Sequence, residues 1–389
     1  MRISKRELIT FVALSLVSLF ADVTYEGARS VLGAYFKILG ATAFIVGFIT
    51  IGDLLGYLMR GVGGFLAGIS RSSKTYWSIV LAGYGINLFA VPLLAFAGRW
   101  DLALALVLIE RIGKGIRAPA RDVILAEVTE NIGKGKGFGL HELMDQIGGV
   151  TGPLFVAWSL YSSANNYKFA FMLLSLPAVI SIVMLLIALI NYPEIKAIEK
   201  ARSLRRTAKL GSRFWFYTIA MVFLSLGYIH WSITAFHMKN IGITSDYMIA
   251  FLYTIAMLSD AIVAFPAGYL YDKVGLMTLL VTPPLAFTVM PLLLQGSLET
   301  IILATIAWGI VMGIYETNMR VAVADIVEPE ARAYAYGIYG MAFGFSWAAG
   351  NILMGYLYGI SRDFLMLYSL LMEIVAFTIL GISIKGSTK

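Results

Sequence analysis

Four charged residues lie at helical spacing in a strongly apolar part of the sequence. They follow the run LALALVLI at intervals of four, three and four positions, and they are Glu110, Lys114, Arg117 and Arg121. In an α-helix these intervals place side chains on one face, which gives a stripe about 16 Å long. Arg111 would flank this stripe. Because isolated charge is costly in an apolar environment, the stripe needs water or partners of opposite sign.

Acidic partners for the stripe occur in neighbouring apolar segments. Counting residues along each segment, at about 1.5 Å per residue, places Asp22 and Asp53 at the level of its first half. Asp145 falls at the level of Arg117, and Arg121 is expected nearer to His141 and Glu142. A carboxylate that loses its cationic partner can take up a proton, which is a physical basis for coupling protons to a conformational change.

Two interpretations of these charged residues stay open. The first is proton coupling, and its candidates are Asp22, Glu26, Asp53, Glu110, Arg111 and Lys114. The second is a clamp that closes the cytoplasmic side, and its candidates are Arg60, Arg121, Glu142, Asp145 and Asp272. Ionisable residues inside a membrane favour a functional role, but paired charges can also be purely structural.

The C-terminal half has fewer charges and more aromatic residues in its apolar segments. Aromatic rings offer apolar surface and bind cations on their faces, so they suit an amphipathic or hydrophobic substrate. The substrate-cavity candidates from both halves are Tyr57, Arg117, His230, Trp231, Tyr315, Glu316 and Arg320. The alternative is that most rings serve helix packing, that His230 is a packing residue, and that Glu316 pairs with Arg320.

The composition indicates a membrane protein. Of the 389 residues 59% are hydrophobic and 14% are charged, and the mean hydropathy is +0.81. Soluble domains carry roughly 25% charged residues. The absence of cysteine excludes disulfides and thiolate sites, and three histidines leave little for a metal site. The net charge of +7 would suit nucleic acid or an anionic membrane surface, and its distribution favours the membrane.

Twelve apolar segments are long enough to cross a bilayer, which takes about 20 residues each. They cover roughly residues 8–34, 42–68, 75–97, 102–124, 137–161, 167–191, 214–238, 247–270, 276–295, 300–325, 334–359 and 363–384. Lysine and arginine concentrate at both termini and in residues 192–213, which are therefore expected in the cytoplasm. The basic start resembles a signal peptide, but its apolar stretch continues past Ala21 and favours an uncleaved first span in the plasma membrane.

The basic segment 192–213 separates two halves that resemble each other. IRAPARDVI at 116–124 aligns with MRVAVADIV at 319–327, which pairs Arg117 with Arg320 and Asp122 with Asp325. Parallel repetition of six-helix halves is typical of secondary transporters. We therefore expect an N-terminal six-helix bundle at 1–191, a cytoplasmic linker at 192–213 and a C-terminal six-helix bundle at 214–389.

Charge avoids the interior of every third expected span, because the third and ninth have none, the sixth has only Lys168 near its start, and the twelfth has only Asp363 at its start and Glu373. In this pattern and in several motifs, the sequence resembles the major facilitator superfamily over its whole length. GYLYDKVG at 268–275 is similar to the loop signature of that family, although the matching loop after the second span has Gly68 in place of the aspartate. RIGKG at 111–115 resembles its proton-coupling motif, and GGVTGP at 148–153 resembles the core of its antiporter motif.

The resemblance implies an all-α fold of twelve transmembrane helices with a pseudo-twofold axis along the membrane normal, in the branch of drug:proton antiporters. The leading hypothesis is a monomer that exports a small amphipathic or hydrophobic compound in exchange for protons. The alternative is facilitated or proton-coupled transport of an anionic, phosphate-like or lipid-like substrate. A third hypothesis is a membrane sensor that does not transport.

The sequence does not indicate an enzyme or a nucleotide-binding protein. IGKGKGFG at 132–139 has no strand before it, and no serine or threonine follows its lysine as a Walker motif requires. No nucleophile–base set or metal-binding motif is visible. We therefore expect no cofactor, no metal and no nucleic acid as partner, and we expect substrate, protons and lipid instead.

Overall fold

Helices make up nearly all of the described chain. The computed structural model of the protein describes residues 4–70, 72–131, 133–195, 210–329 and 331–385, with the backbone alone at 134, 320, 333 and 385. No strand occurs in this part of the chain. Eight helical segments within it are long and apolar enough to cross a membrane. The expected all-helical fold class is therefore confirmed for these residues.

The chain forms two compact units that differ from the two halves of the sequence. The first unit comprises Met1–Val31 and Leu55–Ser203, and the second comprises Leu32–Leu54 and Leu204–Lys389. The sequence analysis expected residues 32–54 in the N-terminal bundle, whereas their contacts group them with the C-terminal residues. Residues 196–209 of the expected linker lie outside the described residues.

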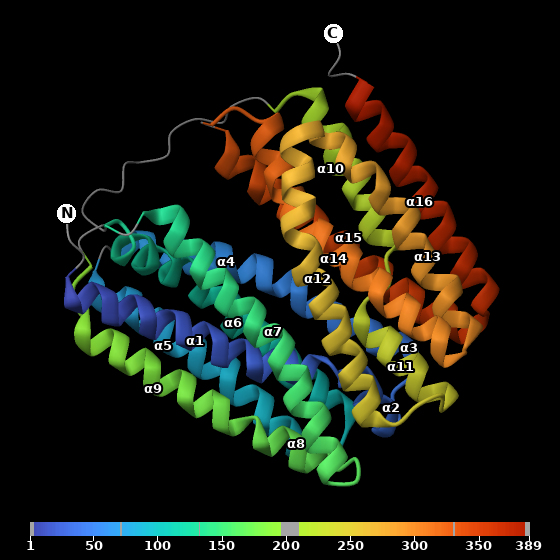
Figure 1. Cartoon of the computed structure of the whole chain (residues 1–389), viewed down its shortest axis with the longest axis horizontal. Helices are drawn as coiled ribbons and strands as arrows, with labels where there is room; N and C mark the ends of the chain where they lie inside the picture. The colour runs from blue at the N-terminus through green and yellow to red at the C-terminus, as the bar shows by residue number, and fades with distance from the viewer. Residues whose placement is uncertain (1–3, 71, 132, 196–209, 330, 386–389) are drawn as a thin grey trace. The chain divides into compact units, whose positions relative to one another are not determined.

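Long helices make up the first unit (Figure 1). They are α1 Lys5–Arg29, the Leu55–Ser70 part of α4 Ile51–Ser70, α5 Ser73–Leu93, α6 Trp100–Val128, α7 Lys134–Ser162, α8 Tyr167–Leu173 and α9 Ser175–Asn191. α1 packs against α7 and α9, and α5 packs against α6. A capping box begins α1, in which Ser4 Oγ accepts from Glu7 N at 3.2 Å and Glu7 Oε2 accepts from Ser4 N at 2.8 Å.

Glycines bring the backbones of α1 and α7 together in this unit. A Cβ at Gly152 would lie 2.6 Å from the carbonyl oxygen of Val23, and one at Gly148 would lie 2.5 Å from that of Leu19. A larger residue at either position would have to push the helices apart. These glycines belong to GGVTGP, and the close approach seats Asp22 of α1 directly against α7.

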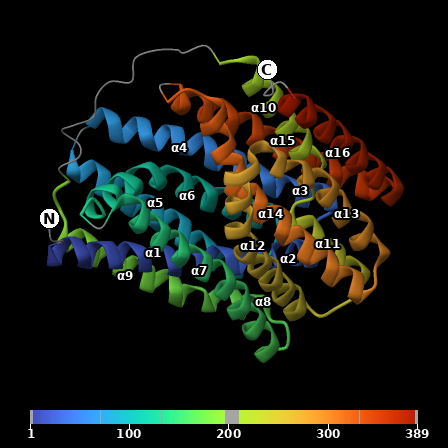
Figure 2. The same ribbon diagram turned by 45° about the horizontal axis from the view of Figure 1, so that its top comes forward.

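The second unit joins a short N-terminal segment to all of the C-terminal helices. Its elements are α2 Leu32–Ile38, α3 Ala43–Gly47, η1 Phe48–Thr50, the start of α4, α10 Ser212–Gly227, α11 Trp231–Ile241, α12 Asp246–Val274, η4 Gly275–Val281, α13 Thr282–Gln295, α14 Leu298–Ile326, α15 Arg332–Ile360 and α16 Arg362–Lys385. α2 packs on α11, α3 packs on α15, and α10 contacts both α15 and α16. α12 runs along α14, as Figure 2 also shows.

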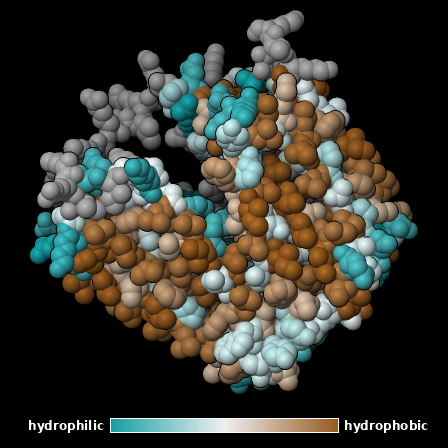
Figure 3. Space-filling view, in the orientation of Figure 1, coloured by the Kyte–Doolittle hydropathy of each residue, from teal (hydrophilic) through white to brown (hydrophobic). Residues whose placement is uncertain are grey.

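Apolar side chains cover much of the outer helix surface in each unit, and hydrophilic residues gather near helix ends (Figure 3). Phe265 on α12 is 82% exposed, and Ile190 on α9 is 76% exposed. Soluble proteins rarely expose contiguous apolar surface on this scale, because it would face water. The surface therefore suits contact with lipid.

Candidate functional site

The expected seventh span is broken. α10 ends at Gly227 and α11 begins at Trp231, and between them Tyr228 and His230 have extended backbone, with ψ angles of 125° and 145°. Such a break frees backbone donors and acceptors from the helical pattern. Where water is excluded these groups must find other partners.

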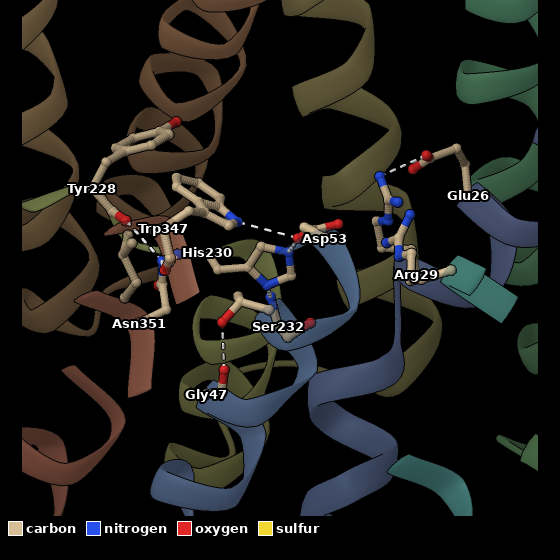
Figure 4. Close-up of polar contacts among 12 residues, drawn as sticks. Glu26, Arg29, Gly47, Asp53, Tyr228, His230, Ser232, Trp347 and Asn351 are labelled. Carbon is tan, nitrogen blue, oxygen red and sulfur yellow. Dashed lines mark hydrogen bonds and ion pairs between the residues drawn. The ribbon is translucent and has the colours of Figure 1, made fainter. Parts of the chain in front are cut away.

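Asn351 of α15 provides partners for the middle of the break (Figure 4). Its Oδ1 accepts a hydrogen bond from the backbone N of His230 at 2.7 Å, and its Nδ2 donates to the carbonyl oxygen of Tyr228 at 3.3 Å. The Asn351 side chain is fully buried. One amide group therefore replaces two partners that a continuous helix would supply.

Two further side chains complete the pairing of the broken backbone. Trp308 of α14 donates from Nε1 to the carbonyl oxygen of Ile229 at 2.9 Å, and Ser369 of α16 donates from Oγ to that of Gly227 at 2.8 Å. Tyr228 Oη in turn donates to the carbonyl oxygen of Trp308 at 2.7 Å. The break is therefore held by side chains from α14, α15 and α16.

His230 caps α11, and this contact fixes where its proton lies. Its Nδ1 accepts a hydrogen bond from the backbone N of Ser232 at 3.1 Å. An accepting nitrogen carries no proton, so the neutral ring holds its proton on Nε2. That nitrogen lies 3.9 Å from Oδ2 of Asp53. His230 Nε2 therefore faces Asp53 from beyond hydrogen-bond distance, and protonation of Nδ1 would remove the cap of α11.

Asp53 is the acidic member of a group that we call the Asp53 cluster, which consists of Asp53, His230 and Trp347. Trp347 Nε1 donates a hydrogen bond to Asp53 Oδ2 at 3.2 Å. Asp53 lies near the start of α4, which continues directly from α3 and η1. Its side chain is 25% exposed. The carboxylate therefore accepts a hydrogen bond from Trp347, lies near His230, and stays accessible to a proton or a cationic group.

Aromatic rings extend from this cluster in continuous contact. Trp347 stacks on Phe343 with the ring centroids 6.0 Å apart, and Phe343 contacts Tyr315 at 4.7 Å. On its other side Trp347 contacts Tyr228 at 5.8 Å. This aromatic wall consists of Tyr217, Tyr228, Trp231, Tyr253, Trp308, Tyr315, Tyr339, Phe343 and Trp347. All nine rings are buried, each 9% exposed or less, so they pack against one another as a continuous core in this structure.

Two cations of the predicted stripe lie over aromatic rings of the first unit. Lys114 Nζ lies 3.7 Å from the ring centroid of Tyr25, and Arg117 Cζ lies 3.6 Å from that of Tyr84. Tyr25 belongs to α1 and Tyr84 to α5, so the stripe on α6 reaches both helices. Cation–π contacts strengthen where water is excluded. The sequence analysis expected carboxylates as partners and did not foresee these rings.

Asp22 is at the centre of the charged residues in the first unit. It is 8% exposed and interacts electrostatically with Lys114, Arg117, Asp145 and Glu26. The group joins α1, α6 and α7. The sequence predicted Asp22 and Asp145 at two different levels, whereas in the structure both acids interact with Arg117, and Asp22 also interacts with Lys114.

Local pairs hold several other candidates. Glu26 pairs with Arg29 one turn later on α1, at 2.6 Å (Figure 4). Glu110 Oε2 lies 3.2 Å from Nε of the adjacent Arg111, and its Oε1 accepts from Nδ2 of Asn87 at 2.6 Å. Since Asn87 belongs to α5, Glu110 is turned toward that helix.

The Arg121 end of the stripe also pairs locally. Arg121 Nη2 lies 2.7 Å from Oδ1 of the adjacent Asp122, although the sequence analysis expected His141 and Glu142 as its neighbours. An electrostatic interaction with His141 and Asp145 remains. His141 is buried, and Glu142 is exposed on the same helix, α7.

The other sequence candidates occupy less buried positions on their helices. Tyr57 is half-buried and Arg60 exposed on α4, Asp272 is exposed near the end of α12, and Glu316 is exposed on α14. The side chain of Arg320 lies outside the described residues. These residues remain candidates by sequence alone.

One known family matches nearly the whole chain. A family model described as Major Facilitator Superfamily matches residues 14–239 and again residues 228–384. The chain belongs to the major facilitator superfamily. It is therefore a transporter and a multi-pass membrane protein rather than an enzyme, as the resemblance in the sequence implied.

Two relatives of this transporter match along almost their full lengths. The uncharacterized protein Rv2265 of Mycobacterium tuberculosis is 36% identical over 92% of the chain and 89% of that protein. The uncharacterized MFS-type transporter MJ1317 of Methanocaldococcus jannaschii is 23% identical over 93% of the chain and 92% of that protein. Both matches support the family, and neither relative carries a substrate in its name.

Solved structures of other transporters share the fold. The nucleoside transporter NupG has a TM-score of 0.72 at 15% identity, and the match covers 98% of this chain and 99% of that one. A bacterial homolog to the human lysosomal transporter Spinster, in an inward-facing and unoccupied conformation, has a TM-score of 0.71 at 14% identity, covering 98% and 96%. At such low identities the likeness shows the fold and not the substrate.

The sequence analysis missed the groups that pair the broken backbone of the transporter. Asn351 and Ser369 are uncharged, and the analysis followed charge and aromatic residues. A usable signal was present at Asn351, because an amide in an apolar segment is costly without a hydrogen-bond partner. Tyr25 and Tyr84 gave no such signal, since tyrosine is common in helix packing.

Proposed function

We propose that this transporter exports a small amphipathic or hydrophobic compound in exchange for protons. The aromatic wall, in which Trp347 donates a hydrogen bond to the carboxylate of Asp53, is the observation that carries the proposal. Ring faces bind apolar groups, and a carboxylate at their edge binds a polar or cationic group of the same molecule. A broken helix beside them supports this role, because secondary transporters build substrate sites at such breaks.

Proton coupling in this proposal centres on Asp22. Asp22 and Asp145 share Arg117, Asp22 also interacts with Lys114, and both cations lie over tyrosine rings. When a conformational change moves a cation away, one of the two carboxylates takes up a proton. Exchange follows if proton uptake and substrate release belong to the same change.

An imposed pH gradient across proteoliposomes tests the proposal with a panel of fluorescent amphipathic compounds. Exchange of one proton predicts about tenfold accumulation for each pH unit, because one unit corresponds to about 1.4 kcal/mol. Asp22→Asn should lose this accumulation and keep exchange of labelled for unlabelled substrate.

Asp363→Asn is the matched control, because Asp363 is an exposed carboxylate at the start of α16. It should transport like the natural protein. If the natural protein does not accumulate substrate in response to the pH gradient, antiport is excluded and facilitated transport is the remaining interpretation. An unchanged pH response in Asp22→Asn would show that Asp22 does not carry the coupled proton.

An anionic substrate is the second candidate, because half-buried Lys114 and buried Arg117 supply positive charge in the first unit. Two facts make it the weaker one: both cations lie over rings, and acids already interact with them, Asp22 with both and Asp145 with Arg117. In the same assay, competition by phosphate-bearing compounds but not by neutral ones would favour it.

We further propose a monomer in the plasma membrane with twelve spans in two six-helix bundles and both termini in the cytoplasm. α6, α7 and α15 have 29 residues each, which at about 1.5 Å per residue is enough to cross a bilayer. Their higher polarity is consistent with helices that face other helices or water.

A further inference from the structure

α16 carries a buried acid that the proposed mechanism does not use. Glu373 is 2% exposed, whereas neighbouring residues such as Ile374 and Phe377 are apolar and exposed. The expected twelfth span has no other charged residue except Asp363 at its start. Glu373 belongs neither to the aromatic wall nor to the group around Asp22.

Glu373 lies against the end of α10, at the break in the expected seventh span. A Cβ at Gly227 would lie 2.8 Å from Oε1 of Glu373. Ser369, one turn earlier on α16, donates its hydrogen bond to the carbonyl oxygen of Gly227 at 2.8 Å. The carbonyl groups that end a helix carry partial negative charge, so this position disfavours a carboxylate.

Among the described residues, none balances a negative charge on Glu373. Neither of its carboxyl oxygens has a hydrogen-bond partner within this part of the chain. The groups that interact with it electrostatically are Tyr228 at the break and Tyr368 on α16 itself. Asp260 of α12 reaches the same Tyr228 and would add a second negative charge to this region.

The described elements packed against α16 supply no compensating cation either. These are α10, α13, α15 and η4. α13 and η4 contain no titratable residue. α10 contains Arg213, at the end opposite Gly227, and Tyr217, and α15 contains Arg332 and five tyrosines. None of these residues contributes to the electrostatic environment of Glu373.

We propose that Glu373 is a proton-binding site of the second unit. An ionised carboxylate without a cation, beside helix carbonyls and away from water, is strongly unfavourable, so Glu373 is a neutral acid in this structure. When α16 separates from the break at Gly227, water reaches the carboxyl group, its O–H bond breaks and water accepts the proton. The role of this release in transport rests on the proposed proton coupling, whereas the neutral state of Glu373 does not.

Labelling with the hydrophobic reagent dicyclohexylcarbodiimide tests the neutral state, because it reacts with protonated carboxyl groups in apolar surroundings. Peptide mass spectrometry of the purified full-length protein at neutral pH should find the label on Glu373. Asp363, the exposed acid on the same helix, is the internal control and should carry at least tenfold less label. Equal labelling of the two residues would overturn the proposal.

Infrared spectroscopy gives an independent measurement if the reagent cannot reach the site. The natural protein should show the C=O stretch of a protonated carboxylic acid at neutral pH, and Glu373→Gln should lose that band. Gln matches the neutral acid in shape, so the variant should fold. An identical spectrum in the two proteins would show that Glu373 is ionised and would overturn the proposal.

Transport in proteoliposomes tests the release step separately. Glu373→Gln should keep exchange of labelled for unlabelled substrate and lose the accumulation driven by a pH gradient by about tenfold per pH unit. Full accumulation in this variant would overturn the release. If the natural protein itself ignores the gradient, proton coupling fails, while labelling and the infrared band still decide whether Glu373 holds a proton.

Discussion

At the scale of residues, buried polar groups of this transporter rely on rings and amides as much as on ion pairs. Lys114 and Arg117 lie over Tyr25 and Tyr84. A ring stabilises a cation without adding an opposite charge, so Lys114 and Arg117 each have a favourable contact that does not depend on the ionisation of Asp22.

Asn351 offers a test at the scale of a single residue. Asn351→Leu should lower the melting temperature clearly, because it leaves the backbone N of His230 and the carbonyl of Tyr228 unpaired, and each such group costs about 1–3 kcal/mol. Asn318→Leu is the matched control, since Asn318 is equally buried and donates to the single carbonyl of Ala267. The melting temperatures are measured by thermal unfolding in detergent. An equal decrease in the two variants would contradict the role of Asn351 at the break.

Helical spacing predicted which charged residues share one face of α6, but it could not predict their partners. It placed Glu110 and Lys114 on one face, but the structure turns Glu110 toward Asn87 on α5 and Lys114 toward Tyr25 on α1. The outcome depends on how each helix is rotated and where it crosses its neighbours. Spacing within one helix contains neither quantity.

At the scale of elements, the positions of long apolar segments predicted where helices lie, but they did not predict the break within the seventh segment. Expected segments 137–161 and 300–325 correspond to α7 Lys134–Ser162 and α14 Leu298–Ile326. The segment 214–238 contains the break between α10 and α11, because its polar backbone groups are paired by distant side chains. Hydropathy measures how apolar a segment is and carries no information on those partners.

Close packing of α1 on α7 gives a prediction at this scale. Gly152→Ala should destabilise the protein by about 1–3 kcal/mol, because the added methyl group would meet the backbone of Val23 and Gly27. Gly139→Ala on the same helix is the control, since a Cβ there meets nothing within 4 Å. It should be neutral or stabilising by up to about 1 kcal/mol from helix propensity. Thermal unfolding that ranks Gly139→Ala as the more damaging variant would refute the close contact.

At the scale of the whole molecule, the absence of cysteine makes the proposed topology directly testable. Single cysteines at exposed Ser162 and Glu328 should differ in intact cells, because the first is expected outside and the second in the cytoplasm. A membrane-impermeant maleimide should label Ser162→Cys at once and Glu328→Cys only after the membrane is permeabilised. Labelling of both before permeabilisation would contradict the orientation.

The family could be predicted from the sequence because its motifs lie in short contiguous stretches such as GYLYDKVG. The division into two units could not, because it follows contacts between distant parts of the chain. Residues 32–54 are continuous in sequence with the first unit and pack with the second. Gly47, for example, has its Cα so close to α15 that a Cβ would lie 2.6 Å from the carbonyl oxygen of Asn351.

The packing of residues 32–54 in the second unit has a consequence for biosynthesis. The segment leaves the ribosome early, but the helices on which it packs, α11 and α15, are made only after the first unit and residues 192–213. The second unit therefore cannot be built from the late helices alone. Residues 32–54 are made early, and they lack their packing partners until α11 and α15 have been made. Assembly of this transporter ends with the closing of a long chain loop, and a separately expressed C-terminal half would lack a piece of its own core.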